Sequence, residues 1–120
     1  MPPGAAGRLH VVRGRLTIYP VILECLKQLR GPIAQISRRD SDLGRQIKRC
    51  ASSIALNVAE GMYSRGKSRE ARYHTALGSA REVLSCLEVA HAMGYLAEPD
   101  EKHVATLNQI IGTLVKLVGV

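Results

Sequence analysis

Apolar residues between positions 41 and 61 recur at alternating steps of four and three, and this spacing constrains the fold more than any other feature of the sequence. The series consists of Leu43, Ile47, Cys50, Ile54 and, at its polar end, Asn57. Steps of four and three bring side chains onto one face of an α-helix, where they form a seam that must be buried. The segment therefore predicts a helix that packs against other helices.

The ends of this helix are predicted from capping residues. Ser41 and Asp42 are both good N-caps, because their side-chain oxygens accept hydrogen bonds from free amides of the first turn. Gly61 is expected to end the helix in the left-handed backbone conformation that glycine favours.

A second helical segment is predicted before this one, from about Tyr19 to Ser37. Pro20 suits a first turn, where no intrahelical hydrogen bond is lost. Gly31 and Pro32 are expected to kink or break the segment, because proline lacks the amide hydrogen that the helix needs. The apolar face consists of Val21, Leu23, Cys25, Leu26, Leu29, Ile33 and Ile36.

Two more segments follow towards the C-terminus. One runs from about Ser68 to Gly94, and the other begins after the turn at Glu98-Pro99-Asp100. Four amphipathic segments with short connections predict an all-α fold, an antiparallel up-down four-helix bundle over residues 16–120. Residues 1–15 are predicted to form a flexible basic N-terminal arm. The two seams are Tyr73, Leu77, Ala80, Leu84, Leu87 and His91, and Val104, Leu107, Ile111, Leu114 and Val118.

The charge of the chain indicates a polyanionic partner. The 120 residues carry 17 Lys and Arg against 10 Asp and Glu, a formal net charge of +7. Residues 1–81 hold ten net positive charges and residues 82–120 hold three net negative ones. Arginine outnumbers lysine 12 to 5, which suits bidentate contact with phosphate. Aromatic residues make up only 3%, which argues against stacking of bases on aromatic platforms.

The basic residues of the predicted bundle form two clusters that we treat as candidate nucleic-acid-binding sites. In an up-down bundle the two clusters lie at opposite ends, so only an oligomer would join them. The alternative is a solvated surface with partial internal ion pairing, because Asp40, Asp42, Glu60 and Glu70 lie in the same region. The first cluster comprises Arg38, Arg39, Arg45, Lys48 and Arg49, and the second comprises Arg65, Lys67, Arg69 and Arg72.

The outer face of the 41–61 helix is predicted to be basic near its start and small and apolar further along. Two interpretations remain open for the apolar part: packing within the same bundle, or a subunit interface. Its members are Ser52, Ala55, Leu56 and Ala59.

Residues 61–68 match the G-x-x-x-x-G-K-[ST] spacing of a phosphate-binding P-loop. That loop requires a preceding strand, whereas a helix is predicted here, so we reject an ATP or GTP site. A different role remains open for this stretch. Amides at the start of the 68–94 helix, with the basic residues beside them, could hold a phosphate of a nucleic-acid backbone.

Three stretches of the sequence resemble the four helix bundle protein family. They are residues 46–61 (QIKRCASSIALNVAEG), Arg72-Tyr73, and residues 76–82 (ALGSARE). The family includes proteins encoded by intervening sequences in bacterial 23S ribosomal RNA genes, and the accessory variability determinants of diversity-generating retroelements are similar. The resemblance implies a four-helix bundle assembled as a homopentamer and no known enzymatic activity. From the retroelement members it implies nucleic-acid binding through basic surface and a reverse transcriptase as partner.

The polar residues of these stretches are interpreted as structural. Asn57 lies on the seam, where a single polar residue can fix register and assembly state. Glu60 is expected to pair with Arg72 or Arg81, and Glu82 with a second arginine. Gly78 and Ser79 are expected to allow close helix contact. Catalysis by Glu60 and Glu82 as paired carboxylates is the alternative, but no nucleophile or base accompanies them.

The cysteines Cys25, Cys50 and Cys86 are odd in number and far apart, and each falls in an apolar helical pattern. We expect buried, reduced thiols in a cytoplasmic protein. A metal site using Cys86, His74 or His91 is the alternative, but no CxxC or HxxxH spacing supports it. No cofactor, signal peptide or membrane span is predicted.

Together these observations predict a non-enzymatic, self-associating bundle that binds RNA, DNA or both largely through phosphates, as an accessory factor to a reverse transcriptase if the retroelement likeness extends to function. The alternative is a protein–protein scaffold or adaptor module with no role in nucleic-acid binding.

Overall fold

The computed structural model describes residues 17–119, so the predicted N-terminal arm lies outside the described residues. Within this range the chain forms four α-helices and no strand, which confirms the all-α prediction. The helices are α3 (Ile18–Arg39), α4 (Ser41–Met62), α5 (Gly66–Ala92) and α6 (Glu101–Leu117).

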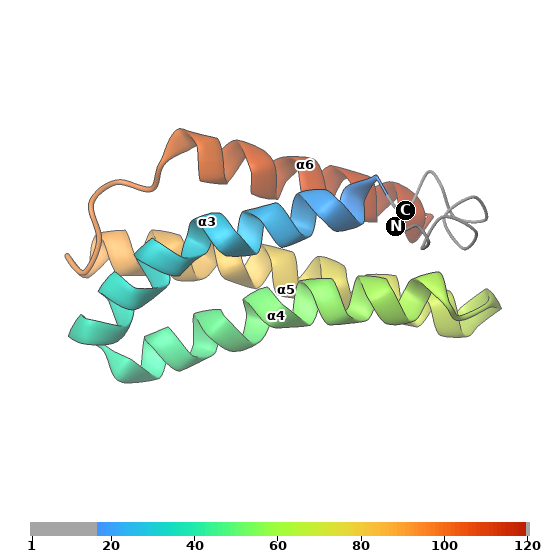
Figure 1. The fold of residues 1–120 in the computed structure, drawn as a ribbon, viewed down its shortest axis with the longest axis horizontal. Coiled ribbons are helices and arrows are strands. Elements are labelled where there is room, and N and C mark those ends of the chain that lie inside the picture. Colours follow the sequence, from blue (N-terminus) through green and yellow to red (C-terminus); the bar gives the residue numbers. More distant parts are fainter. Residues whose placement is uncertain (1–16, 120) are drawn as a thin grey trace.

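The four helices lie side by side along the long direction of the molecule (Figure 1). Helix α4 packs between α3 and α5, and α6 packs against α5 and α3. Because each helix has two main neighbours, the apolar faces of all four meet around one core. None of the helices, over the described residues, combines the length and apolarity needed to cross a bilayer.

The predicted seam of α4 forms part of this core. Ile47, Cys50 and Ile54 are buried, whereas Leu43 and Asn57 are half-buried at its two ends. Small side chains on α5 let the helices approach closely, with Ala76, Ala80 and Ala90 fully buried. The largest fully buried side chains are Tyr73, Ile22, Leu29, Ile36, Ile47, Ile54, Leu87, Leu107, Ile110 and Leu114.

Helix α3 runs unbroken through Gly31 and Pro32, so the predicted break is wrong. Pro32 sits inside the helix, where it cannot donate to the carbonyl of Gln28 and costs about 3 kcal/mol. The apolar face on both sides of the proline outweighs this cost, because Cys25 and Leu29 before it and Ile36 after it are buried in the same core.

The N-cap of α4 is Asp40 rather than Ser41 or Asp42. Its Oδ1 accepts a hydrogen bond from the amide of Leu43 at 3.0 Å. Asp40 has the extended backbone that an N-cap requires, whereas Ser41 and Asp42 already lie within the helix.

The predicted left-handed position of Gly61 is also wrong. The helix continues through Gly61 to Met62, and Gly61 is buried against α5. A Cβ at Gly61 would stand 2.3 Å from Cε1 of Tyr73, so close packing requires the glycine here. The left-handed glycine is Gly66, with φ of 56°, and α5 begins there.

The remaining boundaries agree with the sequence patterns. Helix α5 ends at Ala92, and Gly94 follows in the left-handed conformation with φ of 79°. Helix α6 is capped by Asp100, whose Oδ1 accepts from the amide of Lys102 at 2.8 Å.

Candidate nucleic-acid interface

The first basic cluster surrounds the turn between α3 and α4. Arg38 and Arg39 occupy the last turn of α3, and the other three members lie on the first half of α4. All five side chains are exposed. Arg45 forms an ion pair with Asp42 one turn away. The other four have no ion pair with any residue between 17 and 119, so they are available to an external anion: Arg38, Arg39, Lys48 and Arg49.

The second cluster surrounds the turn between α4 and α5, and half of it is engaged within the chain. Nε of Arg69 donates to the carbonyl of Gly61 at 3.1 Å. Arg72 donates to Oδ1 of Asn57 at 3.5 Å and lies 3.8 Å from Oε1 of Glu60. Arg65 and Lys67 are exposed. The predicted phosphate-contact role of Arg69 therefore competes with its capping of α4.

The two clusters lie at the two ends of α4 (Figure 1). The turns that the clusters surround are separated by the 22 residues of α4, about 33 Å, although the nearest members are closer: Arg49 lies eight residues, or about 12 Å, before Asn57, which Arg72 contacts. This separation agrees with the placement predicted from the sequence.

Residues 61–68 do not form a P-loop. The stretch comprises the end of α4, three connecting residues and the first turn of α5, with no preceding strand. Three of its amides donate to local carbonyls: Tyr63 to Glu60, Ser64 to Gly61, and Ser68 to Arg65. These three amides are therefore not free to cradle a phosphate, whereas the role predicted for the first amides of α5 stays a prediction.

Polar side chains form a ladder of hydrogen bonds across one flank of the α4–α5 pair. Nε2 of Gln46 donates to Oε2 of Glu82 at 3.0 Å. Oγ of Ser79 donates to Oγ of Ser53 at 2.8 Å. Asn57 donates to Oγ and to the backbone carbonyl of Ser53, both at 3.0 Å. We call this set, with Glu60 and Arg72 at its end, the polar ladder.

The polar ladder confirms some of the predicted roles and corrects others. Glu60 pairs with Arg72, and Ser79 makes a close contact between helices, as expected. Glu82 binds Gln46 rather than an arginine. Gly78 is exposed, and a Cβ added there would meet no atom of residues 17–119 within 4 Å, so Gly78 does not provide a close contact between the described helices.

The geometry separates the two carboxylates that were considered as a catalytic pair. Glu60 contacts Arg72, which lies ten residues before Glu82 on α5, or about 15 Å along the helix. Paired carboxylates of glycosidase type stand roughly 5–10 Å apart, which is less than this spacing along α5.

A small polar pocket opens on the same flank, and the sequence patterns did not reveal it. Its volume is about 200 Å³, and we call it the ladder pocket. The signal that could have revealed it is the set of polar residues beside the seam at positions 46, 49 and 53, facing positions 79 and 82. The lining residues are Gln46, Arg49, Cys50, Ser53, Ser79 and Glu82.

The three thiols are free and buried, as expected. Burial, with added contributions from Cys86 and the charge of Glu82, raises the pKa of Cys50 to about 12. Burial also raises the pKa of Cys25 and of Cys86. Reactive cysteines have lowered pKa values, so these thiols stay protonated and unreactive near neutral pH.

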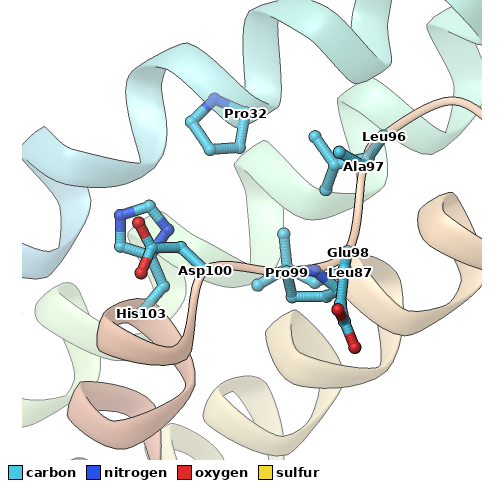
Figure 2. Close-up of a pocket in the computed structure, with 8 residues that line it drawn as sticks. All are labelled: Pro32, Leu87, Leu96, Ala97, Glu98, Pro99, Asp100 and His103. Atoms are coloured by element: carbon cyan, nitrogen blue, oxygen red, sulfur yellow. The ribbon is translucent and has the colours of Figure 1, made fainter.

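A second pocket lies under the α5–α6 connection, at the end of the bundle where α5 ends and α6 begins. Figure 2 shows Pro32 of α3 and Leu87 of α5 beside this connection, and His103 next to Asp100. His91, expected at the core edge, is exposed, and its Nδ1 lies 3.3 Å from the carbonyl oxygen of Leu96. Across residues 17–119 no group of three or more His, Cys, Asp or Glu side chains is placed to hold a metal ion.

The outer face of α4 differs from its predicted pattern. Ala55 is buried inside the chain, whereas Leu56 is 65% exposed. Other large apolar side chains are also exposed: Leu23, Tyr63, Val89 and Met93.

Comparison with known proteins gives one positive result. Searches of curated proteins and of solved structures found no match. The family model for the 23S rRNA-intervening sequence protein matches residues 26–117, from the middle of α3 to the end of α6. Because the match covers most of the chain and all of the polar ladder, the protein belongs to the 23S rRNA-intervening sequence protein family.

Proposed function

We propose that the protein is a non-enzymatic, self-associating four-helix bundle that binds nucleic acid, RNA or DNA, largely through backbone phosphates. The observation that carries this proposal is the first basic cluster. Four of its cations are exposed and have no ion pair within residues 17–119. When unpaired arginine and lysine side chains contact the phosphates of a nucleic acid, they release the counterions condensed on it, and this release favours binding.

The proposed architecture is an up-down antiparallel bundle that assembles as a homopentamer. Contacts across the polar ladder support the antiparallel part, because Gln46, Ser53 and Asn57 on α4 meet residues 82, 79 and 72 on α5. Exposed apolar side chains support self-association, since Leu56 and Tyr63 on the α4 side would be covered by another copy. Assembly would also bring basic clusters of several chains onto one surface.

A binding titration at two salt concentrations tests the proposed function. Four phosphate contacts on a single strand give a slope of about −3 for log K against log salt, so raising salt from about 50 to about 200 mM weakens binding about fiftyfold. Labelled RNA and DNA strands of equal length would be titrated by fluorescence anisotropy. No binding at low salt, or an affinity independent of salt, would overturn the proposal and favour the protein–protein scaffold.

Light scattering tests the assembly separately. We expect a molar mass near five times that of the 13.0 kDa chain. A monomeric mass would contradict the assembly proposal and leave the phosphate-binding proposal standing.

The genomic neighbourhood tests the biological role. A reverse transcriptase gene beside a template repeat would support a retroelement accessory factor with that enzyme as partner. A position inside a 23S ribosomal RNA gene would support the role of an intervening-sequence protein.

A further inference from the structure

The ladder pocket has the size of one chemical group rather than of a whole ligand. Its volume of about 200 Å³ lies below the roughly 300 Å³ at which pockets for complete small molecules begin. A pocket of this size suits one ring system of a longer molecule whose remainder stays on the protein surface.

Two charged side chains line the ladder pocket, one a hydrogen-bond acceptor and the other a hydrogen-bond donor. Glu82 presents a carboxylate whose Oε2 accepts from Gln46, while its Oε1 has no hydrogen bond with residues 17–119. Arg49 presents a guanidinium with no ion pair to the described chain. These two charged side chains line one pocket without being paired to each other.

The position of the pocket links it to the proposed phosphate contacts. Arg49 belongs both to the pocket lining and to the first basic cluster. Lys48, another cation of that cluster without an ion pair to residues 17–119, is its neighbour in sequence. A nucleic-acid strand held by these cations would therefore pass beside the opening of the pocket.

Guanine is the base whose edges match this pair of groups. Its N1–H and N2–H donors point in parallel at two acceptors, which a carboxylate provides, and its O6 and N7 are acceptors for arginine. Cytosine offers a carboxylate only its single amino group, and adenine gives arginine no pair of adjacent acceptors. The N1–H and N2–H groups are free only in an unpaired base, so the strand must be single.

We propose that the ladder pocket binds an unpaired guanine of a single nucleic-acid strand, with Glu82 accepting from N1–H and N2–H and Arg49 donating to O6 and N7. This inference rests on the proposed function, since phosphate contacts by the first cluster bring the strand to the pocket. Recognition by edge hydrogen bonds is also consistent with the scarcity of aromatic side chains for stacking.

Matched RNA strands test the inference on the full chain. Three labelled strands of equal length are compared by fluorescence anisotropy at one salt concentration: adenine only, adenine with guanine at every third position, and the same strand with inosine replacing guanine. We expect the guanine strand to bind about tenfold more tightly than the adenine strand. Inosine lacks N2–H but keeps N1–H, O6 and N7, so the inosine strand should lose the part of this preference that comes from one of the two bonds to Glu82.

Two variants with equal change in charge locate the site. Glu82→Gln removes the carboxylate but keeps the side-chain shape, and it should abolish the guanine preference. Glu88→Gln changes the net charge equally on an exposed position of α5 outside the ladder pocket, and it should retain the preference. The inosine comparison needs no variant, so it holds even if Glu82→Gln folds poorly.

Each outcome bears on one of the two proposals. Equal, salt-dependent binding of the adenine and guanine strands would overturn guanine recognition and leave phosphate binding in place. A guanine preference that survives Glu82→Gln would overturn the assignment to this pocket. If no RNA strand binds at low salt, guanine recognition in RNA fails, and phosphate binding fails for RNA.

Discussion

Gly61 of α4 lies against the ring of Tyr73 of α5, and three ring atoms would stand within 2.9 Å of a Cβ added at Gly61. Tyr73 is 1% exposed, so the ring has no room to withdraw. We predict that Gly61→Ala destabilises the protein by about 2 kcal/mol, because overpacking of roughly 3 kcal/mol exceeds the gain of about 1 kcal/mol in helix propensity. Urea unfolding at a fixed protein concentration measures the change.

Gly78→Ala is the matched control. A Cβ at Gly78 would meet no atom of the part of the chain that the structure describes within 4 Å, and the residue lies inside α5. The substitution should stabilise the chain by roughly 0.5–1 kcal/mol through helix propensity alone. Destabilisation by both alanines would mean that the contact with Tyr73 is not the cause. If only Gly78→Ala destabilises the protein, Gly78 packs against another copy in the assembly.

Substitutions of Arg69 and of Lys67 should differ in their effect on stability, although both residues belong to the second basic cluster. Arg69 donates to the carbonyl of Gly61, one of the last carbonyls of α4, so Arg69→Ala should cost about 1–2 kcal/mol of unfolding free energy. Lys67 is exposed and makes no ion pair with residues 17–119, so Lys67→Ala should leave stability within about 0.5 kcal/mol. Equal stability losses in the two variants would contradict the capping role of Arg69.

Pro32 should be a source of instability in α3. We predict that Pro32→Ala raises the unfolding free energy by about 1–3 kcal/mol, because alanine restores the amide that can donate to the carbonyl of Gln28. Pro20→Ala is the control, since Pro20 lies in the first turn of α3, where no intrahelical bond is lost. A destabilising Pro32→Ala would show that contacts of the proline ring outweigh the missing hydrogen bond.

The stability of the protein should fall in alkaline solution through Cys50. Burial raises the pKa of Cys50 from 9.0 to about 12, so the folded chain keeps a proton that the unfolded chain loses. The stability due to this thiol is therefore complete below pH 9 and is lost as pH rises towards 12. Cys50→Ala should show a smaller alkaline fall than the wild type. Parallel curves for the two proteins would contradict this prediction.

The fold followed from the sequence because the seams of the four helices are long and regular. Positions such as Ile47 and Ile54 repeat over enough turns to specify a buried face, and Gly94 and Asp100 are strong local signals. The errors fell where a tertiary contact overrides local preference. Core packing carries α3 through Pro32, and the ring of Tyr73 explains Gly61 without any left-handed turn.

The candidate site was only partly predictable. Exposed cations such as Arg38 follow from composition and helix placement, and Arg72 is one of the two partners predicted for Glu60. Which arginine caps a carbonyl and which stays free depends on how the turn between α4 and α5 closes, as Arg69 shows. The ladder pocket depends on the relative register of two helices, which neither helix specifies alone.

The central claim is tested most directly by the salt dependence of RNA binding in a variant whose first basic cluster has lost two charges. Arg38→Gln with Arg39→Gln should reduce the slope of log K against log salt by about 1.4, because two single-strand phosphate contacts are lost. Lys102→Gln with Lys116→Gln removes the same charge from exposed positions on α6, and its slope should match that of the wild type. Equal reductions in both double variants would contradict the claim, because binding would then follow total charge rather than the cluster between α3 and α4.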